Sequence, residues 1–85
     1  MAHPVLKLYA LSTCIHCRHT KEYLNSHHIP YEFIDVDLQE GEARDRVLAE
    51  VKGYNPNMSF PTIVVPDGGS VIIGFQEQKL AKYIP

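Results

Sequence analysis

The two cysteines of this chain, Cys14 and Cys17, are separated by only two residues. A disulfide between residues this close in sequence closes a very small loop, so it removes little freedom from the unfolded chain. Secreted domains of this size are normally held by several well-spaced disulfides. The 85 residues must therefore be stabilised by a packed core, for which the length just suffices. The cysteine pair is expected to have a chemical use instead.

Composition narrows the class of protein further. The hydrophobic fraction of 45% and the charged fraction of 21% are those of an ordinary globular domain. Eight basic and 10 acidic residues give a net charge of −2, so the basic surface that nucleic-acid binding requires is absent. Neither a membrane-spanning apolar run nor a secretory signal is recognisable. We expect one domain over residues 1–85, cytoplasmic and monomeric, without nucleic-acid or membrane partners.

Hydrophobic periodicity and turn residues predict the element order β-α-β-α-β-β-α. A β-α-β unit places its two strands in parallel through a crossover, whereas a closing hairpin adds antiparallel strands. The expected fold class is therefore α/β, with a four-stranded mixed sheet flanked by three helices. Strands are expected at 5–10, 31–37, 62–65 and 71–73, a turn at 66–70, and helices from about 14 to the residues before Pro30, at 40–52 and at 76–84.

Individual residues support the helix bounds. Ser12 and Thr13 offer side-chain oxygens that can cap the first helix. Gly53 is expected to end the second helix, because glycine is favoured just after a helix. The side chains that recur at helical spacing in the three helices are Ile15, His19, Tyr23 and Leu24, then Val47, Leu48 and Val51, then Leu80 and Ile84, the last two expected to face inward.

The dithiol has a built-in asymmetry. Cys14 lies at the start of the first helix, where unsatisfied backbone N–H groups and the positive end of the helix dipole favour a thiolate. This lowers its pKa and predicts Cys14 as the nucleophile. Cys17, one turn deeper, is expected to be more buried and to act as the resolving cysteine. His16 is expected to stabilise the Cys14 thiolate relative to the disulfide, which makes the pair a stronger oxidant. The alternative for His16 is a solvated surface residue without effect on the potential.

A Cys-x-x-Cys pair between a strand and a helix is typical of thioredoxin-like redox centres. One alternative is a buried pair of small apolar residues. A second is a metal or iron–sulfur carrier, since Cys14, Cys17, His16 and His19 are all possible ligands. One helix cannot direct all four at a single ion, and no second Cys-x-x-Cys completes such a site. No metal site is therefore predicted, and the carrier remains an alternative from a different class.

Asp35 and Asp37 form a smaller cluster at the end of the second predicted strand. Two carboxylates on one side of a strand end can hold a hard cation. More commonly they form a solvated strand end or cap the following helix, and that interpretation is favoured here.

Three segments, in order along nearly the whole chain, resemble the glutaredoxin family of the thioredoxin superfamily. Residues 9–17 (Tyr-Ala-Leu-Ser-Thr-Cys-Ile-His-Cys) match its strand, loop and dithiol. Residues 59–62 (Ser-Phe-Pro-Thr) match the segment that holds a cis-proline against the active site. Gly74 and Phe75 match the glycine-containing turn before the last helix. The chain is identified on these motifs as a dithiol glutaredoxin-like protein with a Cys-Ile-His-Cys centre.

The resemblance implies that the α/β fold is thioredoxin/glutaredoxin-like, and that the chain is a thiol–disulfide oxidoreductase in which Cys14 attacks and Cys17 resolves. It also implies a cis Phe60–Pro61 bond and no bound prosthetic group, with glutathione as reductant and with protein disulfides or glutathione mixed disulfides as substrates. Backbone at Phe60 would pair with the cysteinyl part of glutathione, and Gly74 with Phe75 would approach its γ-glutamyl end. The residues expected to contact substrate are Tyr9, Ser12, Thr13, Ser59, Phe60, Pro61, Gly74 and Phe75, with Tyr9 alternatively a core residue.

Two departures from the family pattern leave the electron donor open. Leu11 stands where many glutaredoxins have a lysine that contacts the glycyl carboxylate of glutathione. Gly-Phe at 74–75 replaces the common Gly-Gly and is similar to redoxins reduced by thioredoxin reductase. Thioredoxin reductase is therefore the alternative partner, and Phe75 is a possible exposed contact for a protein.

Overall fold

A computed structural model describes residues 5–66 and 70–85. Most of the turn predicted at 66–70 lies outside these residues. The elements follow the predicted order β-α-β-α-β-β-α, with two added 3-10 helices. They are β1 (Leu6–Ala10), α1 (Ile15–Ser26), β2 (Tyr31–Asp35), η1 (Val36–Leu38), α2 (Gly41–Tyr54), β3 (Thr62–Val64), β4 (Val71–Ile73), α3 (Glu77–Leu80) and η2 (Ala81–Tyr83).

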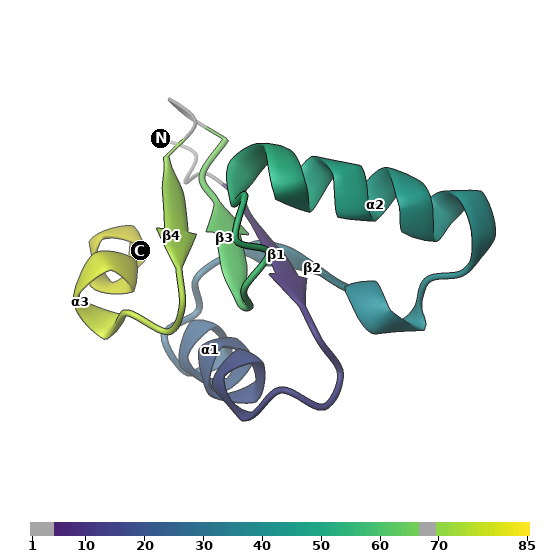
Figure 1. Cartoon of the computed structure of the whole chain (residues 1–85). Coiled ribbons are helices and arrows are strands. Elements are labelled where there is room, and N and C mark those ends of the chain that lie inside the picture. Colours follow the sequence, from purple (N-terminus) through teal and green to yellow (C-terminus); the bar gives the residue numbers. More distant parts are fainter. Residues whose placement is uncertain (1–4, 67–69) are drawn as a thin grey trace.

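The four strands form one mixed sheet in the order β2-β1-β3-β4. β1 pairs in parallel with β2 and antiparallel with β3, and β3 pairs antiparallel with β4. Leu8 is central, opposite Phe33 on one side and Ile63 on the other. Helices α1 and α3 cover one face of the sheet and α2 covers the other (Figure 1). The predicted thioredoxin-like architecture is confirmed.

Alternation along the strands divides the core into two layers. Leu6, Leu8 and Ala10 of β1 face the layer under α1 and α3, which also contains Cys17 and Leu80. The side chain between them, Tyr9, faces the opposite layer, which it shares with Val36, Val47, Val51 and Val64. Because Cys17 belongs to the first layer, the dithiol is anchored directly to the core.

The strand directions bring four chain segments to one edge of the sheet. β1, β2 and β4 all end at this edge and β3 begins there, as their pairings require. The loop after β1 leads to Cys14, and the segment after β2 is η1. Phe60 and Pro61 precede β3, whereas Gly74 follows β4. Topology therefore assembles the candidate site from residues that are distant in sequence.

The first helix begins differently from the prediction. Cys14 is its N-cap residue, and neither Ser12 nor Thr13 caps it. The buried face of α1 consists of Cys17, Thr20 and Leu24, whereas Ile15 is 49% exposed. The periodicity correctly indicated a helix and identified its buried face only in part, since Leu24 is buried and Tyr23 packs against the core, whereas His19 is exposed.

Other predicted element ends also shift. β2 stops at Asp35, where the chain turns into η1. Helix α2 continues through Gly53 to Tyr54, and Gly53 does not adopt the positive φ that makes glycine useful at a helix end. After Leu80 the helix tightens into η2, which has about three residues per turn. This change of period leaves Ile84 exposed instead of inward-facing.

Among the described residues, no helix has the length and apolar character needed to cross a membrane.

Candidate active site

Cys14 and Cys17 occupy the first turn of α1 and differ sharply in exposure. Cys14 is partly exposed, and its Sγ accepts a hydrogen bond from the Cys17 backbone N–H at 3.3 Å. This places the Cys14 sulfur at the helix N-terminus, where backbone donors stabilise negative charge. Cys17 is only 1% exposed, as the sequence predicted. The outer sulfur is therefore accessible and the inner one lies behind it in the core.

Burial controls the acidity of the inner thiol. Loss of solvation raises the pKa of Cys17 to about 12, and the interaction with Cys14 acts in the same direction. A hydrogen bond with the backbone of Leu11 and, to a smaller extent, the positive charge of Lys21 one turn further along α1 oppose this increase in the pKa of Cys17. Cys17 is thus a protonated thiol near neutral pH, and the nearby charge of Lys21 favours its ionised form.

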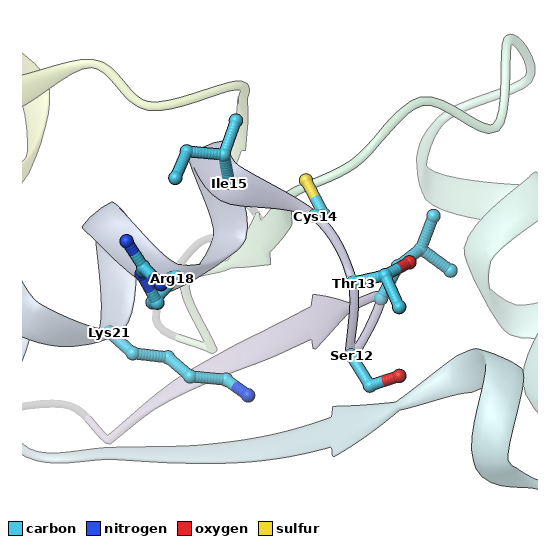
Figure 2. A pocket seen from close by; sticks show the side chains of 7 residues that line it. Ser12, Thr13, Cys14, Ile15, Arg18 and Lys21 are labelled. Atoms are coloured by element: carbon cyan, nitrogen blue, oxygen red, sulfur yellow. The ribbon is translucent and has the colours of Figure 1, made fainter.

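A pocket of about 250 Å³ opens beside Cys14 (Figure 2). One wall is the loop before the cysteine and the other is the outer face of α1. Arg18 and Lys21 bring positive charge to the second wall, but Arg18 lies 3.6 Å from Glu22 and Lys21 lies 3.0 Å from Asp35. The residues that line the pocket are Leu11, Ser12, Thr13, Cys14, Ile15, Arg18 and Lys21.

The segment before β3 contains the predicted cis bond between Phe60 and Pro61. Pro61 is fully buried, whereas Phe60 is half-buried and packs against both core layers. Phe60 and Cys14 both contact the layer that contains Cys17. The cis-proline segment and the dithiol therefore share one part of the core, although residues 59–61 do not line the pocket beside Cys14.

Asn55 holds this segment from inside, and sequence reasoning missed it. It is 1% exposed, and its Nδ2 donates to Ser59 O (3.0 Å), Ser59 Oγ (3.0 Å) and Thr62 Oγ1 (3.1 Å). Its Oδ1 accepts from the Asn57 N–H at 3.2 Å. An asparagine in a Pro- and Ser-containing loop reads as an ordinary turn residue, so the sequence carried no signal that it is buried.

Gly74 is hydrogen-bonded to the cis-proline, since its N–H donates to Pro61 O at 2.8 Å. Its φ of +83° favours glycine at this position. Phe75 is half-buried instead of fully exposed, with ring centroids 5.8 Å from Tyr23 and 6.2 Å from His19. The structure thus joins the second and third family motifs directly and packs Phe75 against α1.

The remaining residues of the predicted site fall into two groups, one in the core and one on the surface. Tyr9 is 2% exposed and donates to Glu50 Oε2 at 2.9 Å, so it belongs to the core and does not line the pocket. Ser12 and Thr13 are exposed beside Cys14, and Ser12 is hydrogen-bonded to Asp37. His16 is exposed on α1. Its effect on the potential remains a prediction.

Asp35, the last residue of β2, pairs with Lys21, and the exposed Asp37 accepts from Ser12. Asp37 thus lies at a solvated strand end, which was one of the two favoured interpretations. Neither aspartate caps α2, whose N-cap residue is Glu40. Within residues 5–66 and 70–85, no three His, Cys, Asp or Glu side chains form a group suited to a metal ion. Cys14 and Cys17 would need ligands from elsewhere to hold one.

Comparisons with known proteins agree with this geometry. The sequence model of the glutaredoxin family matches residues 6–72. An uncharacterised glutaredoxin-like 8.6 kDa protein of the rubredoxin operon of Clostridium pasteurianum is 31% identical over 80 residues, which cover 94% of this chain and 97% of that protein.

Solved structures show the same relationship. Methanoredoxin from Methanosarcina acetivorans has a TM-score of 0.88 and 33% identity, covering 96% of this chain and 85% of its own. A glutaredoxin from Archaeoglobus fulgidus has a TM-score of 0.84 and 34% identity, covering 95% of this chain and 86% of its own. Because the family model spans residues 6–72 and these relatives match nearly the whole chain, the protein belongs to the glutaredoxin family.

Proposed function

We propose that this protein is a thiol–disulfide oxidoreductase that uses Cys14 as nucleophile and Cys17 as resolving cysteine. The observation that supports this best is the placement of the two sulfurs. Cys14 Sγ accepts the Cys17 N–H at the start of α1 and is partly exposed, whereas the Cys17 thiol is buried behind it. An accessible sulfur that accepts a backbone N–H, with a protected second thiol behind it, is suited to two successive exchange steps.

In the first step the Cys14 thiolate attacks one sulfur of a substrate disulfide. A bond forms between Cys14 and that sulfur, the substrate S–S bond breaks, and the second substrate sulfur leaves as a thiolate that takes a proton from water. In the second step Cys17 loses its proton and attacks Cys14 Sγ. The first substrate sulfur leaves, the substrate has gained two electrons, and Cys14 and Cys17 are joined as a disulfide.

Two thiols of glutathione would return the protein to its reduced state and form glutathione disulfide. Membership of the glutaredoxin family supports glutathione as the donor. The observation that favours a flavin-dependent thioredoxin reductase instead is Leu11, an apolar residue in the pocket wall beside Cys14. Protein disulfides and glutathionylated cysteines are the proposed substrates, and we propose that the protein acts in the cytoplasm without a bound cofactor.

The deciding experiment is to add reduced glutathione alone to the oxidised protein and to follow intact mass over time. Fast reduction through a one-glutathione adduct would support glutathione as the donor. Negligible reduction at millimolar glutathione, together with fast reduction by thioredoxin reductase and NADPH, would support the reductase. Cys14→Ser should abolish exchange with either donor, and retained turnover would contradict the assignment of the nucleophile. Cys17→Ser should accumulate the mixed disulfide.

A further inference from the structure

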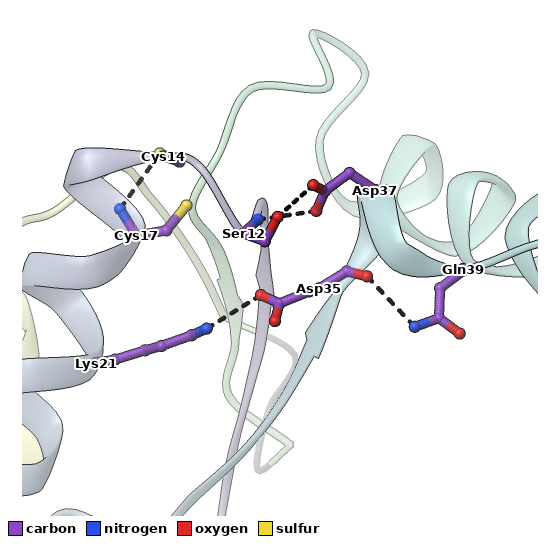
Figure 3. A network of polar contacts seen from close by, with 7 residues as sticks. All are labelled: Ser12, Cys14, Cys17, Lys21, Asp35, Asp37 and Gln39. Atoms are coloured by element: carbon purple, nitrogen blue, oxygen red, sulfur yellow. Dashed lines mark hydrogen bonds and ion pairs between the residues drawn. The ribbon is translucent and has the colours of Figure 1, made fainter.

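Two hydrogen bonds join the loop before Cys14 to a carboxylate 25 residues later in the chain. The Ser12 N–H donates to Asp37 Oδ1 at 2.8 Å, and the Ser12 hydroxyl donates to Asp37 Oδ2 at 2.5 Å (Figure 3). Each carboxylate oxygen thus takes a different donor of the same residue. Such a two-point contact fixes both the position and the orientation of Ser12.

The position of Ser12 bears directly on Cys14. The Cys14 N–H donates to Leu11 O at 3.2 Å, which closes a turn over residues 11–14. Cys14 leaves this turn with φ −85° and ψ 120° as the N-cap of α1. Ser12 and Thr13, in the middle of the turn, are exposed, so burial contributes little to holding them. The contacts with Asp37 anchor the turn that aims the Cys14 sulfur.

The backbone next to Asp37 is packed against the core, whereas the Asp37 side chain itself is exposed. Asp37 lies in η1, and its neighbour Val36 is 3% exposed within the core layer under α2. Gln39 Nε2 donates to Asp35 O at 3.3 Å across the same short helix. Asp37 therefore presents its carboxylate from a fixed connection between β2 and α2.

We propose that Asp37 is a positioning residue for the reaction of Cys14. By holding Ser12 it keeps the loop at 11–13 in the conformation that forms one wall of the pocket and directs Cys14 Sγ toward an incoming disulfide. This inference deepens the proposed thiol–disulfide exchange and rests on it.

Asp37 can affect Cys14 in two ways, by positioning Ser12 and through its negative charge, and these two effects change the exchange rate in opposite directions. A negative charge near Cys14 disfavours its thiolate, so removal of that charge alone would speed up the reaction. Loss of the contact between Asp37 and Ser12 would instead slow the exchange reaction of Cys14. The hydrogen bonds from Ser12 are the main cause that lowers the pKa of Asp37, so the carboxylate is ionised near neutral pH and accepts from both donors. Other charged groups at this end of the sheet are Lys21, Asp35 and, in the pocket wall, Arg18.

The test compares Asp37→Ala with Asp37→Asn in a Cys17→Ser background, in which Cys14 alone carries out exchange. Asparagine can still accept from the Ser12 N–H and can donate to its hydroxyl, so it keeps the contact without the charge. Alanine loses both. We expect Asp37→Ala to slow exchange with bis(2-hydroxyethyl) disulfide by about tenfold, a size typical of a small misplacement of a reacting group. Asp37→Asn should match or exceed the parent rate.

Two further variants sharpen the comparison. Ser12→Ala keeps the backbone contact and should be intermediate, and adding it to Asp37→Ala should cause no further loss, because the two residues act through one contact. Asp45→Ala, at an exposed position on α2, is the matched control and should equal the parent. Amide hydrogen exchange at Ser12 and Cys14 should become faster in Asp37→Ala and remain slow in Asp37→Asn.

Three results would overturn the proposal. Parent-like exchange in Asp37→Ala would show that the contact is unimportant. Equal slowing in Asp37→Asn and Asp37→Ala would show that a retained contact with Ser12 does not preserve the rate, which contradicts a positioning role. If the parent protein did not exchange with any disulfide while Asp37→Ala still lost amide protection, the proposed function would fail and Asp37 would have only a structural role.

Discussion

Lys21 Nζ lies 3.0 Å from Asp35 Oδ1, in an ion pair that joins α1 to the end of β2 below the dithiol (Figure 3). The two side chains are only 23% and 16% exposed, so water screens this pair less than a surface pair. Lys21 lies one turn beyond Cys17 and opposes the increase in the pKa of that thiol. Asp35 thus holds in place a cation whose charge favours ionisation of Cys17, which the proposed resolving step requires.

Lys21→Met should therefore slow resolution. Without the ammonium group, the pKa of Cys17 rises further, and a smaller fraction of Cys17 is ionised at any given pH. The lifetime of the Cys14 mixed disulfide, followed by rapid acid quench and intact mass, should lengthen a few-fold near neutral pH. The first attack by Cys14 should change less. Lys52→Met, at an exposed position on α2, is the control, and an equal change in both variants would contradict a specific role for Lys21.

The reduced protein should lose stability at alkaline pH. The folded state raises the pKa of Cys17 from 9.0 to about 12, so the unfolded state releases this proton first. The contribution to stability is complete below pH 9 and is lost as pH rises toward 12, by up to about 1 kcal/mol per pH unit. Urea unfolding of the reduced protein between pH 8 and about 10.5 would measure the slope.

Cys17→Ala should reduce this alkaline slope, and the same slope in wild type and variant would contradict the assignment. Tyr9 contributes in the same direction, because burial and then its hydrogen bond to Glu50 raise its pKa. Tyr9→Phe therefore separates the contribution of the phenol to the alkaline loss of stability from that of the Cys17 thiol. The slope of stability against pH that remains in Tyr9→Phe should disappear when Cys17→Ala is added.

Replacement of Asn55 should damage both stability and the site. Asn55→Ala leaves the groups that it bonded at Ser59 and Thr62 with one partner fewer in a buried region, which costs about 2–3 kcal/mol. Chemical denaturation measures this loss. The cis-proline segment should also lose its set position, so exchange activity should fall in the fraction that remains folded. Asn57→Ala is the matched control, because Asn57 is exposed and only its backbone N–H is bonded to Asn55. Equal stability of the two variants would refute the role of Asn55.

His16→Ala tests the predicted tuning of the dithiol. If the imidazole stabilises the Cys14 thiolate, its removal should make the reduction potential more negative than in wild type, where we expect roughly −230 to −180 mV. Equilibration with defined glutathione or dithiothreitol buffers measures the potential. His19→Ala, also exposed on α1 and one turn further along, controls for the general loss of an imidazole. Identical potentials in wild type and His16→Ala would show that His16 is a solvated surface residue.

Local patterns in the sequence determined the secondary structure and singled out the cysteine pair of the candidate site. Strand and helix periodicity, together with turn residues, correctly predicted the order of elements, because each depends on neighbours within a few residues. The position of Cys14 at a helix start also followed from local pattern. The cis bond at Pro61 was predicted only through family resemblance, because nothing in the local sequence distinguishes it from an ordinary proline before a strand.

The tertiary structure decided which residues support that pair. Asn55, Asp37 and Lys21 each act through a partner on another element, and their types are common in loops, at strand ends and on helix surfaces. Their roles arise only when the sheet order β2-β1-β3-β4 brings four segments to one edge. In the folded chain, the buried Asn55 is hydrogen-bonded to the cis-proline segment, and Lys21 lies near Cys17. Local periodicity carries no information on such contacts, because the interacting side chains are joined by packing and not by neighbouring positions in the chain.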